Sequence, residues 1–442
     1  MAVGTGGTGR GKNMKRRGRG AGGNVPWGVI ISGVVILSAT VGVLGWLATT
    51  SDALKAKVDE AADSFQVAYW RKPIPPQGAP PETLADPARG LHPENCALCH
   101  YRQFQDWRES LHAQGMGPGV TGQFPGMSFA GQAQCLECHA PMSEQWAQLP
   151  NRAGWLDNTG FDGTLRDKGL VCSACHLRNH QRHGPPATPN RVESGGMEAS
   201  VLLHGEPVRT PHFQASEFCK GCHQHPPTSL IINGKTVENT YNEWLESGYP
   251  EQGKTCQQCH MPEGRHLWRG IHDPEMTRSG VTVRTELDPA QPEAGQPLRA
   301  RLILTNSGTG HAFPTYTTPA VYMRAAILDA GGNVIPGGNF EEILLQRQLD
   351  MSTSPWSESF DTRVFPGRSV TLDFARVVPE GAASVYLWVW VEPDQFYTGF
   401  YRARLQGGED FPGREVLEKA LANSLESHYA LFSRTIPVRP PR

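Results

Sequence analysis

The 442-residue sequence lacks a basic surface outside its first 20 residues, and its formal net charge is only −2 at pH 7. Binding to nucleic-acid phosphates needs clustered lysine and arginine, so we expect no nucleic acid among its partners. The sequence also lacks any cysteine outside one short pattern, and it has none after residue 276. A framework of scattered disulfides is therefore not expected.

All ten cysteines belong to a Cys-x-x-Cys-His motif. The five copies are Cys96/Cys99/His100, Cys135/Cys138/His139, Cys172/Cys175/His176, Cys219/Cys222/His223 and Cys256/Cys259/His260. Successive copies start 39, 37, 47 and 37 residues apart. A single copy is compatible with a zinc half-site, a redox dithiol or a disulfide, but a zinc ribbon would space its pairs by about 15 to 20 residues and would not require each histidine.

The chemistry that uses all three side chains is covalent attachment of haem c. The two thiols add to the two vinyl groups on one edge of the porphyrin, and the imidazole that follows binds the iron as its proximal ligand. The sequence therefore predicts five covalently attached haem c groups. Their proximal ligands are His100, His139, His176, His223 and His260.

The second axial ligand of each iron separates an electron carrier from an enzyme. Eleven histidines lie outside the motifs. We expect distal ligands among His112, His204, His266, His272 and His311, with His180, His183 and His212 as weaker candidates. In "NSGTGHAFPTY", His311 follows an expected strand in a glycine-rich loop, and we expect it to reach a haem across a domain boundary. No pattern identifies a catalytic residue.

The amino-terminal residues predict three segments. Residues 1–24 are basic and rich in glycine, which indicates a disordered cytoplasmic tail, and residues 25–50 carry no charge, which predicts a transmembrane anchor. Residues 51–90 predict a helix followed by a proline-rich spacer. The positive-inside bias then places the chain in the cytoplasmic membrane with a single pass, and its haem and β domains in the periplasm.

The rest of the chain predicts a mixed fold. Residues 91–276 have few long apolar periods, so we expect a pentahaem domain of short helices and loops, mostly helical, in which the haems form the core. Residues 277–408 alternate between apolar and polar residues, which predicts an antiparallel, immunoglobulin-like β-sandwich with Trp388 and Trp390 in its core. Residues 409–442 predict a terminal helix, with His428 on its apolar face, and a tail.

Several words around the motifs resemble multihaem cytochromes related to hydroxylamine oxidoreductase and its tetrahaem electron acceptor. They are "FQDWRESLHA", "SEFCKGCHQ" and "EWLESGYPEQGKTCQQCHMP", and the resemblance covers about residues 91–275. It implies that His112 is a distal ligand. The sequence has no Cys-x-x-Cys-Lys word, unlike the related nitrite reductases. Cys96 lies 48 positions after Ala48, which disfavours direct quinol oxidation.

These patterns predict a membrane-anchored pentahaem cytochrome c that passes electrons along its haems in respiration, with unidentified redox proteins as donor and acceptor and the lipid bilayer as anchor. One alternative is an oxidoreductase of a small nitrogen or sulfur compound, with one open iron. Another is a subunit of a larger respiratory complex.

Overall fold

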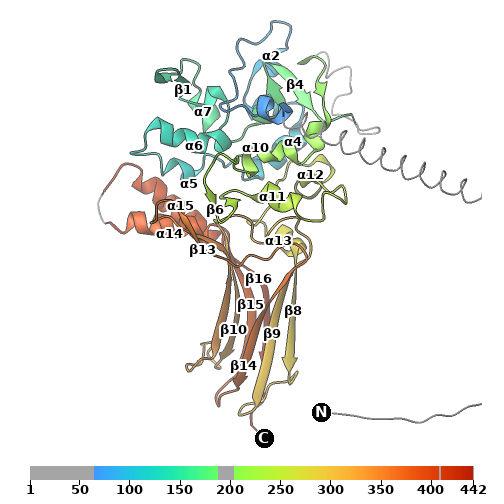
Figure 1. Ribbon diagram of the computed structural model, residues 1–442, viewed down its shortest axis with the longest axis vertical. Helices are drawn as coiled ribbons and strands as arrows, with labels where there is room; N and C mark the ends of the chain where they lie inside the picture. Colours follow the sequence, from blue (N-terminus) through green and yellow to red (C-terminus); the bar gives the residue numbers. More distant parts are fainter. Residues whose placement is uncertain (1–63, 188–203, 408–409, 442) are drawn as a thin grey trace, which may run out of the picture. The chain divides into compact units, whose positions relative to one another are not determined.

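The structure is a computed structural model that describes residues 64–187, 204–407 and 410–441 (Figure 1). The expected tail over 1–24 and the expected anchor over 25–50 lie outside these residues. Across the three described ranges, no helix combines the length and the apolar character that a membrane crossing requires. The predicted fold class, with its single transmembrane helix and mostly helical haem domain, is therefore corrected.

Short helices carry the five motifs. In chain order, the helices of this part are α2 (Asp86–Arg89), α3 (Pro93–Ala97), α4 (Tyr101–Glu109), α5 (Pro118–Thr121), α6 (Phe129–His139), η1 (Ser143–Gln145), α7 (Gly163–Arg166), α8 (Cys172–His176), η2 (Pro211–Gln214), α10 (Glu217–His223), α11 (Thr240–Leu245), α12 (Cys256–His260), η3 (Pro262–Gly264) and α13 (Pro274–Gly280). The longest, α6, has 11 residues. Their shortness follows from frequent glycine and proline, which end helices.

The same part also contains small sheets, which the sequence analysis did not predict. They are formed by β1 (Gln148–Asn151) with β2 (Gly154–Asp157), by β3 (Leu177–Arg178), β4 (Gln181–Gly184) and β5 (Val208–Arg209), and by β6 (Ile231–Ile232) with β7 (Lys235–Thr236). Only 30% of the structure is helical. The prediction of a mostly helical haem domain is wrong. The small sheets were missed because strands of two residues are too short to show an alternation of apolar and polar residues.

The proline-rich segment packs against the motif-bearing part instead of forming a spacer. Ile74 is 0% exposed and pairs with Met142 in an isolated bridge. Lys72 donates to the Cys138 Sγ atom at 3.2 Å and to the Gly221 carbonyl at 2.5 Å. This segment therefore belongs to the wall around the second and fourth motifs.

Two antiparallel sheets form a sandwich in the carboxy-terminal part (Figure 1). One has the order β14-β9-β8, from β8 (Val281–Asp288), β9 (Pro297–Asn306) and β14 (Ser369–Val377), and the other has the order β11-β10-β15-β16, from β10 (Ala320–Leu328), β11 (Phe340–Leu345), β15 (Ser384–Glu392) and β16 (Tyr429–Pro437). A separate hairpin joins β12 (Arg347–Asp350) and β13 (Ser357–Asp361). Inward side chains of both sheets form one core, including Leu302, Met323 and Leu387.

Alternation along β15 places the aromatic residues on the opposite face from the one expected. Val385, Leu387, Val389 and Val391 are all fully buried in the core, so Trp388 and Trp390 lie on the outer face, where Trp388 stacks on Tyr386 at 4.7 Å. The prediction that both tryptophans enter the core is wrong. Both faces of the strand are apolar, and the period alone does not select between them.

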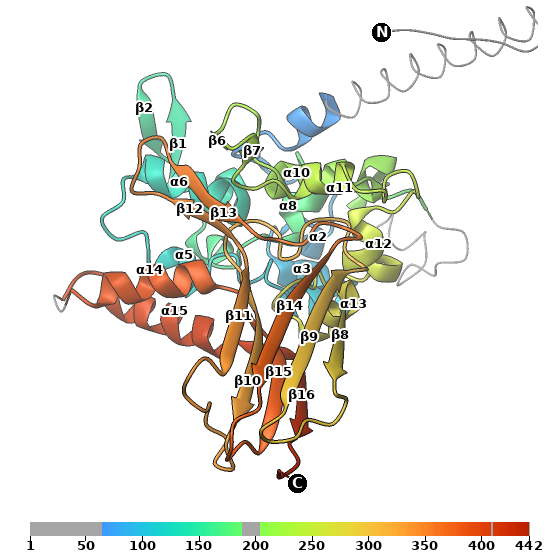
Figure 2. The same cartoon turned by 60° about the horizontal axis from the view of Figure 1, so that its bottom comes forward.

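The expected terminal helix is only partly present. In chain order, a pair of helices, α14 (Gln395–Leu405) and α15 (Arg414–Glu426), comes between β15 and β16, and Figures 1 and 2 show the pair to one side of the sandwich. The strand β16 then completes the sheet by pairing with β15. Leu431 and Ile436 face the core, so pairing with β15 overrides the helical period over 428–432. Tyr401 of α14 donates to the Gly119 carbonyl of α5 at 3.1 Å, which fixes the helix pair against the motif-bearing part.

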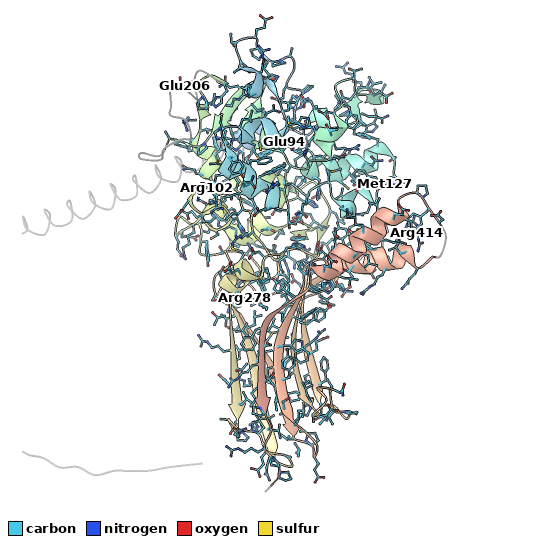
Figure 3. All side chains as sticks on the ribbon, turned by 180° about the vertical axis from the view of Figure 1, so that it is seen from behind. Glu94, Arg102, Met127, Glu206, Arg278 and Arg414 are labelled. Atoms are coloured by element: carbon cyan, nitrogen blue, oxygen red, sulfur yellow. The ribbon has the colours of Figure 1, made fainter. Side chains whose placement is uncertain are left out.

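The described residues belong to one compact unit, and specific contacts join its two parts. Arg278 of α13, labelled in Figure 3, donates to the carbonyl oxygens of Ala430 and Leu431 in β16, both at 3.3 Å. Glu243 of α11 forms a buried ion pair with Arg363 at 2.8 Å. Loops at this end of the sandwich therefore meet the motif-bearing helices.

Candidate metal centres

Four of the five motifs end a helix with their histidine. His139, His176, His223 and His260 are the last residues of α6, α8, α10 and α12. The helical turn brings the two cysteines of each motif to one side and leaves the imidazole at the end, free to turn towards a ligand. In the first motif, His100 lies between α3 and α4.

All ten cysteines are free thiols, so the disulfide alternative is absent from the structure. In the described residues, which include every cysteine and every histidine, no group of three His, Cys, Asp or Glu side chains is arranged to hold a bare metal ion. Each motif instead keeps two unbonded thiols beside one imidazole. This donor set fits covalent attachment of a haem at each motif.

Two of the ten motif cysteines lie at the surface. Cys99 of the first motif is exposed, as is Cys259 of the fifth motif, whereas the other eight cysteines are half-buried. Cys99 lies in the turn between α3 and α4, where Leu98 and Tyr101 are 70% and 65% exposed. Attachment at Cys99 stays a prediction, and a haem bound there would lie at the surface.

Thiols of different motifs adjoin one another in three pairs. The pairs are Cys96 with Cys172, Cys138 with Cys222, and Cys219 with Cys256. The Cys175 thiol also acts electrostatically on Cys219 and Cys222. These contacts connect the motifs in the order first, third and fourth, with the second and the fifth each joined to the fourth.

Backbone carbonyls fix the tautomer of three motif histidines. The Nδ1 atom of His139 bonds to Gly115 O at 2.7 Å, that of His176 to His183 O at 2.8 Å, and that of His260 to Arg269 O at 2.7 Å. A carbonyl oxygen only accepts, so each Nδ1 carries the proton and each Nε2 keeps its lone pair. This second-sphere hydrogen bond is the usual partner of a metal-bound histidine.

Three motif histidines face a second imidazole at nearly the same separation. The ring centres are 6.4 Å apart for His112 and His223, 6.1 Å for His176 and His266, and 6.4 Å for His260 and His311. An iron that binds two imidazoles holds their ring centres roughly 6 Å apart, because each metal–nitrogen bond is about 2 Å and each ring centre lies about 1 Å further. The spacing therefore fits one iron between each pair.

Burial keeps these imidazoles neutral. Burial, together with neighbouring histidines, lowers the pKa of His112 to about 3 and that of His223 to about 4. Burial also lowers the pKa values of His176, His260 and His311. Only the neutral ring offers a lone pair to iron. The Nδ1 atom of His112 is buried with no hydrogen-bond partner among the described residues.

Two residues that the sequence analysis missed position His112 and His266. Trp268 contacts both rings, at 4.6 Å and 5.0 Å between ring centres, and its backbone adopts φ +43°. Asp106 of α4 accepts from the His266 backbone N at 2.9 Å and from Arg265 Nε at 2.7 Å, and these bonds hold the pKa of Asp106 below its ordinary range. Asp106 lies in the sequence word "QDW", and this word is the sequence signal from which its role could have been identified.

The loop between β9 and β10 delivers His311 to the fifth motif. Its Nδ1 atom bonds to Ala312 O at 2.9 Å, which leaves Nε2 facing His260. The His311 carbonyl accepts from Asn306 Nδ2 at 2.9 Å, and Ala312 N donates to Glu243 at 3.2 Å. The sandwich therefore presents a histidine to a motif of the other part, and ligation of an iron by His311 stays a prediction.

The other distal candidates lie in different surroundings and stay predictions. His272 Nε2 bonds to Asp394 at 3.0 Å, His180 Nε2 bonds to Gly78 O at 3.0 Å, and His204 Nδ1 bonds to Gly205 O at 3.0 Å. His212 stacks on Phe65 at 3.9 Å, and His183 meets the face of Tyr69 at 5.4 Å.

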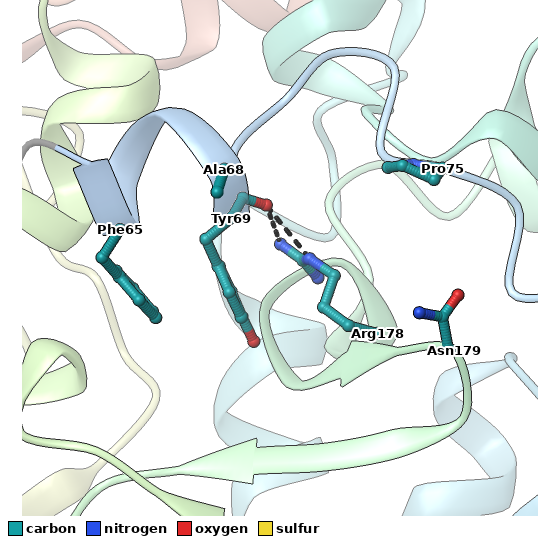
Figure 4. A pocket seen from close by; sticks show the side chains of 6 residues that line it. All are labelled: Phe65, Ala68, Tyr69, Pro75, Arg178 and Asn179. Carbon is teal, nitrogen blue, oxygen red and sulfur yellow. Dashed lines mark hydrogen bonds between the residues drawn. The ribbon is translucent and has the colours of Figure 1, made fainter.

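A cavity of about 340 Å³ lies beside the third motif (Figure 4). It is lined by Phe65, Ala68, Tyr69, Pro75, Arg178 and Asn179. The Tyr69 hydroxyl donates to the Cys175 carbonyl at 2.8 Å, and Arg178 lies over the Tyr69 ring while donating to the Tyr69 carbonyl. These bonds connect the segment before the first motif to the third.

Comparison with solved structures finds a penta-haem cytochrome c552 from Thermochromatium tepidum. The two chains are 19% identical, the match covers 79% of this chain and 99% of the other, and the TM-score is 0.54. This similarity shows a shared fold. A structural-genomics target named SoR45 (9% identity, 37% and 88% coverage, TM-score 0.17) and the sporulation control protein Spo0M from Bacillus subtilis (7%, 36% and 49%, 0.14) are too dissimilar to carry weight.

No protein-family model matches the chain, and no curated protein matches it either.

Proposed function

We propose that the protein is a pentahaem cytochrome c that transfers electrons along its covalently bound haems. The observation that carries this proposal is the set of three imidazole pairs, His112/His223, His176/His266 and His260/His311, with ring centres 6.1 to 6.4 Å apart. Two imidazoles close an iron to other ligands and favour outer-sphere transfer of one electron. The shared fold with a penta-haem cytochrome supports the same assignment.

The adjoining thiols support a continuous route for electrons. They link the first, third and fourth motifs in sequence, and the second and the fifth motifs adjoin the fourth. A haem at each motif would then have at least one close neighbour. In this proposal, the protein fixes the spacing, the axial ligands and the burial of each haem.

Compartment and partners belong to the proposal as well. Covalent haem attachment is expected outside the cytoplasm, so we place the haem-bearing part in the periplasm and its donor and acceptor among respiratory redox proteins. The relation to the hydroxylamine oxidoreductase group rests on the sequence words alone. Residues 25–50 are outside the described ranges and carry no part of this proposal.

Two measurements on the purified holoprotein test the function. Mass spectrometry under denaturing conditions should show five haem groups bound to the polypeptide. Coulometric titration should then show five electrons taken up per polypeptide, spread over several potentials. Attachment of fewer haems, or uptake of two electrons by a dithiol couple without haem, would refute the proposal.

A further inference from the structure

One lysine of the proline-rich segment joins two motifs that are far apart in the sequence. The Lys72 ammonium donates to the Cys138 Sγ atom of the second motif at 3.2 Å and to the Gly221 carbonyl of the fourth motif at 2.5 Å. The carboxylate of Glu137, next to Cys138 in the chain, is exposed and forms no ion pair with Lys72 in the described part of the chain. The charge of Lys72 therefore lies between these two motifs and is bonded to neutral groups of both.

The backbone on both sides of Lys72 is fixed, so the side chain is held at this place. Before it, the Trp70 ring lies directly over Gly221, where an added Cβ atom would come within 3.0 Å of the ring. After it, the Ile74 N–H donates to the Pro141 carbonyl at 2.7 Å. The segment thus packs on the fourth motif at one end and on the residues that follow the second motif at the other.

The fourth motif also contacts the fifth, through neutral groups. The Cys256 N–H donates to Ser216 Oγ at 3.1 Å, and Gln257 Nε2 donates to the Ala215 carbonyl at 2.7 Å. Ser216 and Ala215 directly precede α10, which carries the fourth motif. The fourth motif therefore has a positively charged contact with the second motif and uncharged hydrogen bonds with the fifth.

A positive charge close to a haem favours the reduced state, because reduction adds one negative charge to the haem. A lysine ammonium keeps its charge at pH 7. With haem attached, the Cys138 sulfur is the thioether sulfur at the porphyrin edge, so Lys72 lies beside a haem of the second motif. Gly221 lies between the two cysteines of the fourth motif, so the same charge lies close to a haem there.

We propose that Lys72 is a redox-tuning residue shared by the second and fourth haems. The inference rests on the proposed function for the presence of both haems. The single charge of Lys72 raises both reduction potentials together. At the fourth haem, where the contacts to the second and fifth motifs meet, this charge biases electrons towards the second haem. Lys72 acts on the distribution of electrons and is not itself an iron ligand.

The test is a redox titration of the intact holoprotein followed by electron paramagnetic resonance, which separates low-spin ferric haems by their g values. The signal lost in His112→Ala identifies the fourth haem, and the signal lost in His311→Ala identifies the fifth. At a fixed potential, Lys72→Gln should raise the ratio of oxidised to reduced fourth haem about tenfold, which is about 59 mV for one electron. The same ratio for the fifth haem should stay within about twofold.

Two controls separate the charge from the packing of the side chain. Lys72→Arg keeps the positive charge and should return the ratio for the fourth haem to within about twofold of the unmodified protein. Lys168→Gln removes a lysine that pairs with Glu94 at 2.5 Å near the first motif, so it should change the ratio of neither haem. Lys72→Met is a second uncharged variant with the same expected result as Lys72→Gln.

An unchanged ratio for the fourth haem in the uncharged variants would overturn the inference. Equal shifts of the fourth and fifth haems would also overturn it, as would a Lys72→Arg variant that behaves like Lys72→Gln. Loss of haems from both uncharged variants, with all haems retained in Lys72→Arg, would assign Lys72 a structural role and overturn the tuning role. In each of these cases, five haems and five electrons in the unmodified protein would leave the proposed function intact.

Discussion

The ion pair between Glu243 and Arg363 should control the fifth haem site. The Arg363 side chain is 0% exposed and that of Glu243 is 2% exposed. One Glu243 oxygen accepts from Arg363 at 2.8 Å, and the other accepts from Ala312 N at 3.2 Å, next to His311. The pair therefore ties α11 to the loop that presents the distal histidine.

The cost of breaking this pair follows from its burial. Removing one partner of a buried ion pair costs about 3–5 kcal/mol. Arg363 keeps two bonds to Asp361, so we expect Glu243→Gln to lose about 3 kcal/mol of unfolding free energy, at the low end. Glu243→Ala also removes the acceptor for Ala312 N and should cost about 1 kcal/mol more.

The assay is guanidinium unfolding of the oxidised holoprotein, followed by circular dichroism and by the low-spin haem spectrum. Glu286→Gln is the control, because Glu286 pairs with Arg301 at 2.9 Å on the exposed face of the sandwich. That change should stay within about 0.5 kcal/mol. If Glu243→Gln is as mild as Glu286→Gln and the low-spin spectrum is unchanged, the buried tether does not hold His311.

Three further predictions follow. His311→Ala should convert one of the low-spin haems to high spin, measured by electron paramagnetic resonance, whereas His428→Ala, outside the assigned pairs, should convert none; the same count in both variants would remove His311 from the ligand set. Despite burial, bonds from Arg363 and Lys235 lower the pKa of Asp361 to about 2. The ionised carboxylate therefore stabilises the folded state at pH values above the pKa of the unfolded carboxyl, about 4, and this stabilisation is lost as the pH falls towards 2. Asp361→Asn should therefore flatten the loss of unfolding free energy between pH 4 and pH 2, and a slope like that of the unmodified protein would contradict this. Lys72→Met removes a positive charge at the Cys138 sulfur. It should lower the reduction potential of a haem at the second motif by on the order of 50 mV or more, as measured in a spectroscopic redox titration. An unchanged set of reduction potentials would show that the charge is screened.

The sequence predicted the chemistry of the motifs better than the surroundings of each motif. The geometry of a Cys-x-x-Cys-His motif can be predicted from the sequence, because its thiols and its imidazole are neighbours in the chain. The imidazole that faces each of three motif histidines is set by tertiary packing. His112 precedes its partner His223 by more than a hundred residues, and only the folded chain brings these two rings to 6.4 Å. The sequence singled out His311 as a candidate because glycine, phenylalanine and proline flank it in a loop.

Elements whose local pattern is short or ambiguous were not predicted correctly. The strand β16 carries an apolar period that also fits a helix, and only pairing with β15 decides between them. Trp388 and Trp390 lie on one face as expected, but this is the outer face, because the residues that alternate with them along β15 fill the core: Val385, Leu387, Val389 and Val391.

The most direct test of the account is to locate the irons in crystals of the holoprotein by anomalous diffraction at the iron edge. The account predicts five iron positions, one beside each Cys-x-x-Cys-His motif. Three of them should lie between His112 and His223, His176 and His266, and His260 and His311. Irons absent from these three positions, or bound there by other side chains, would contradict the assignment of the imidazole pairs.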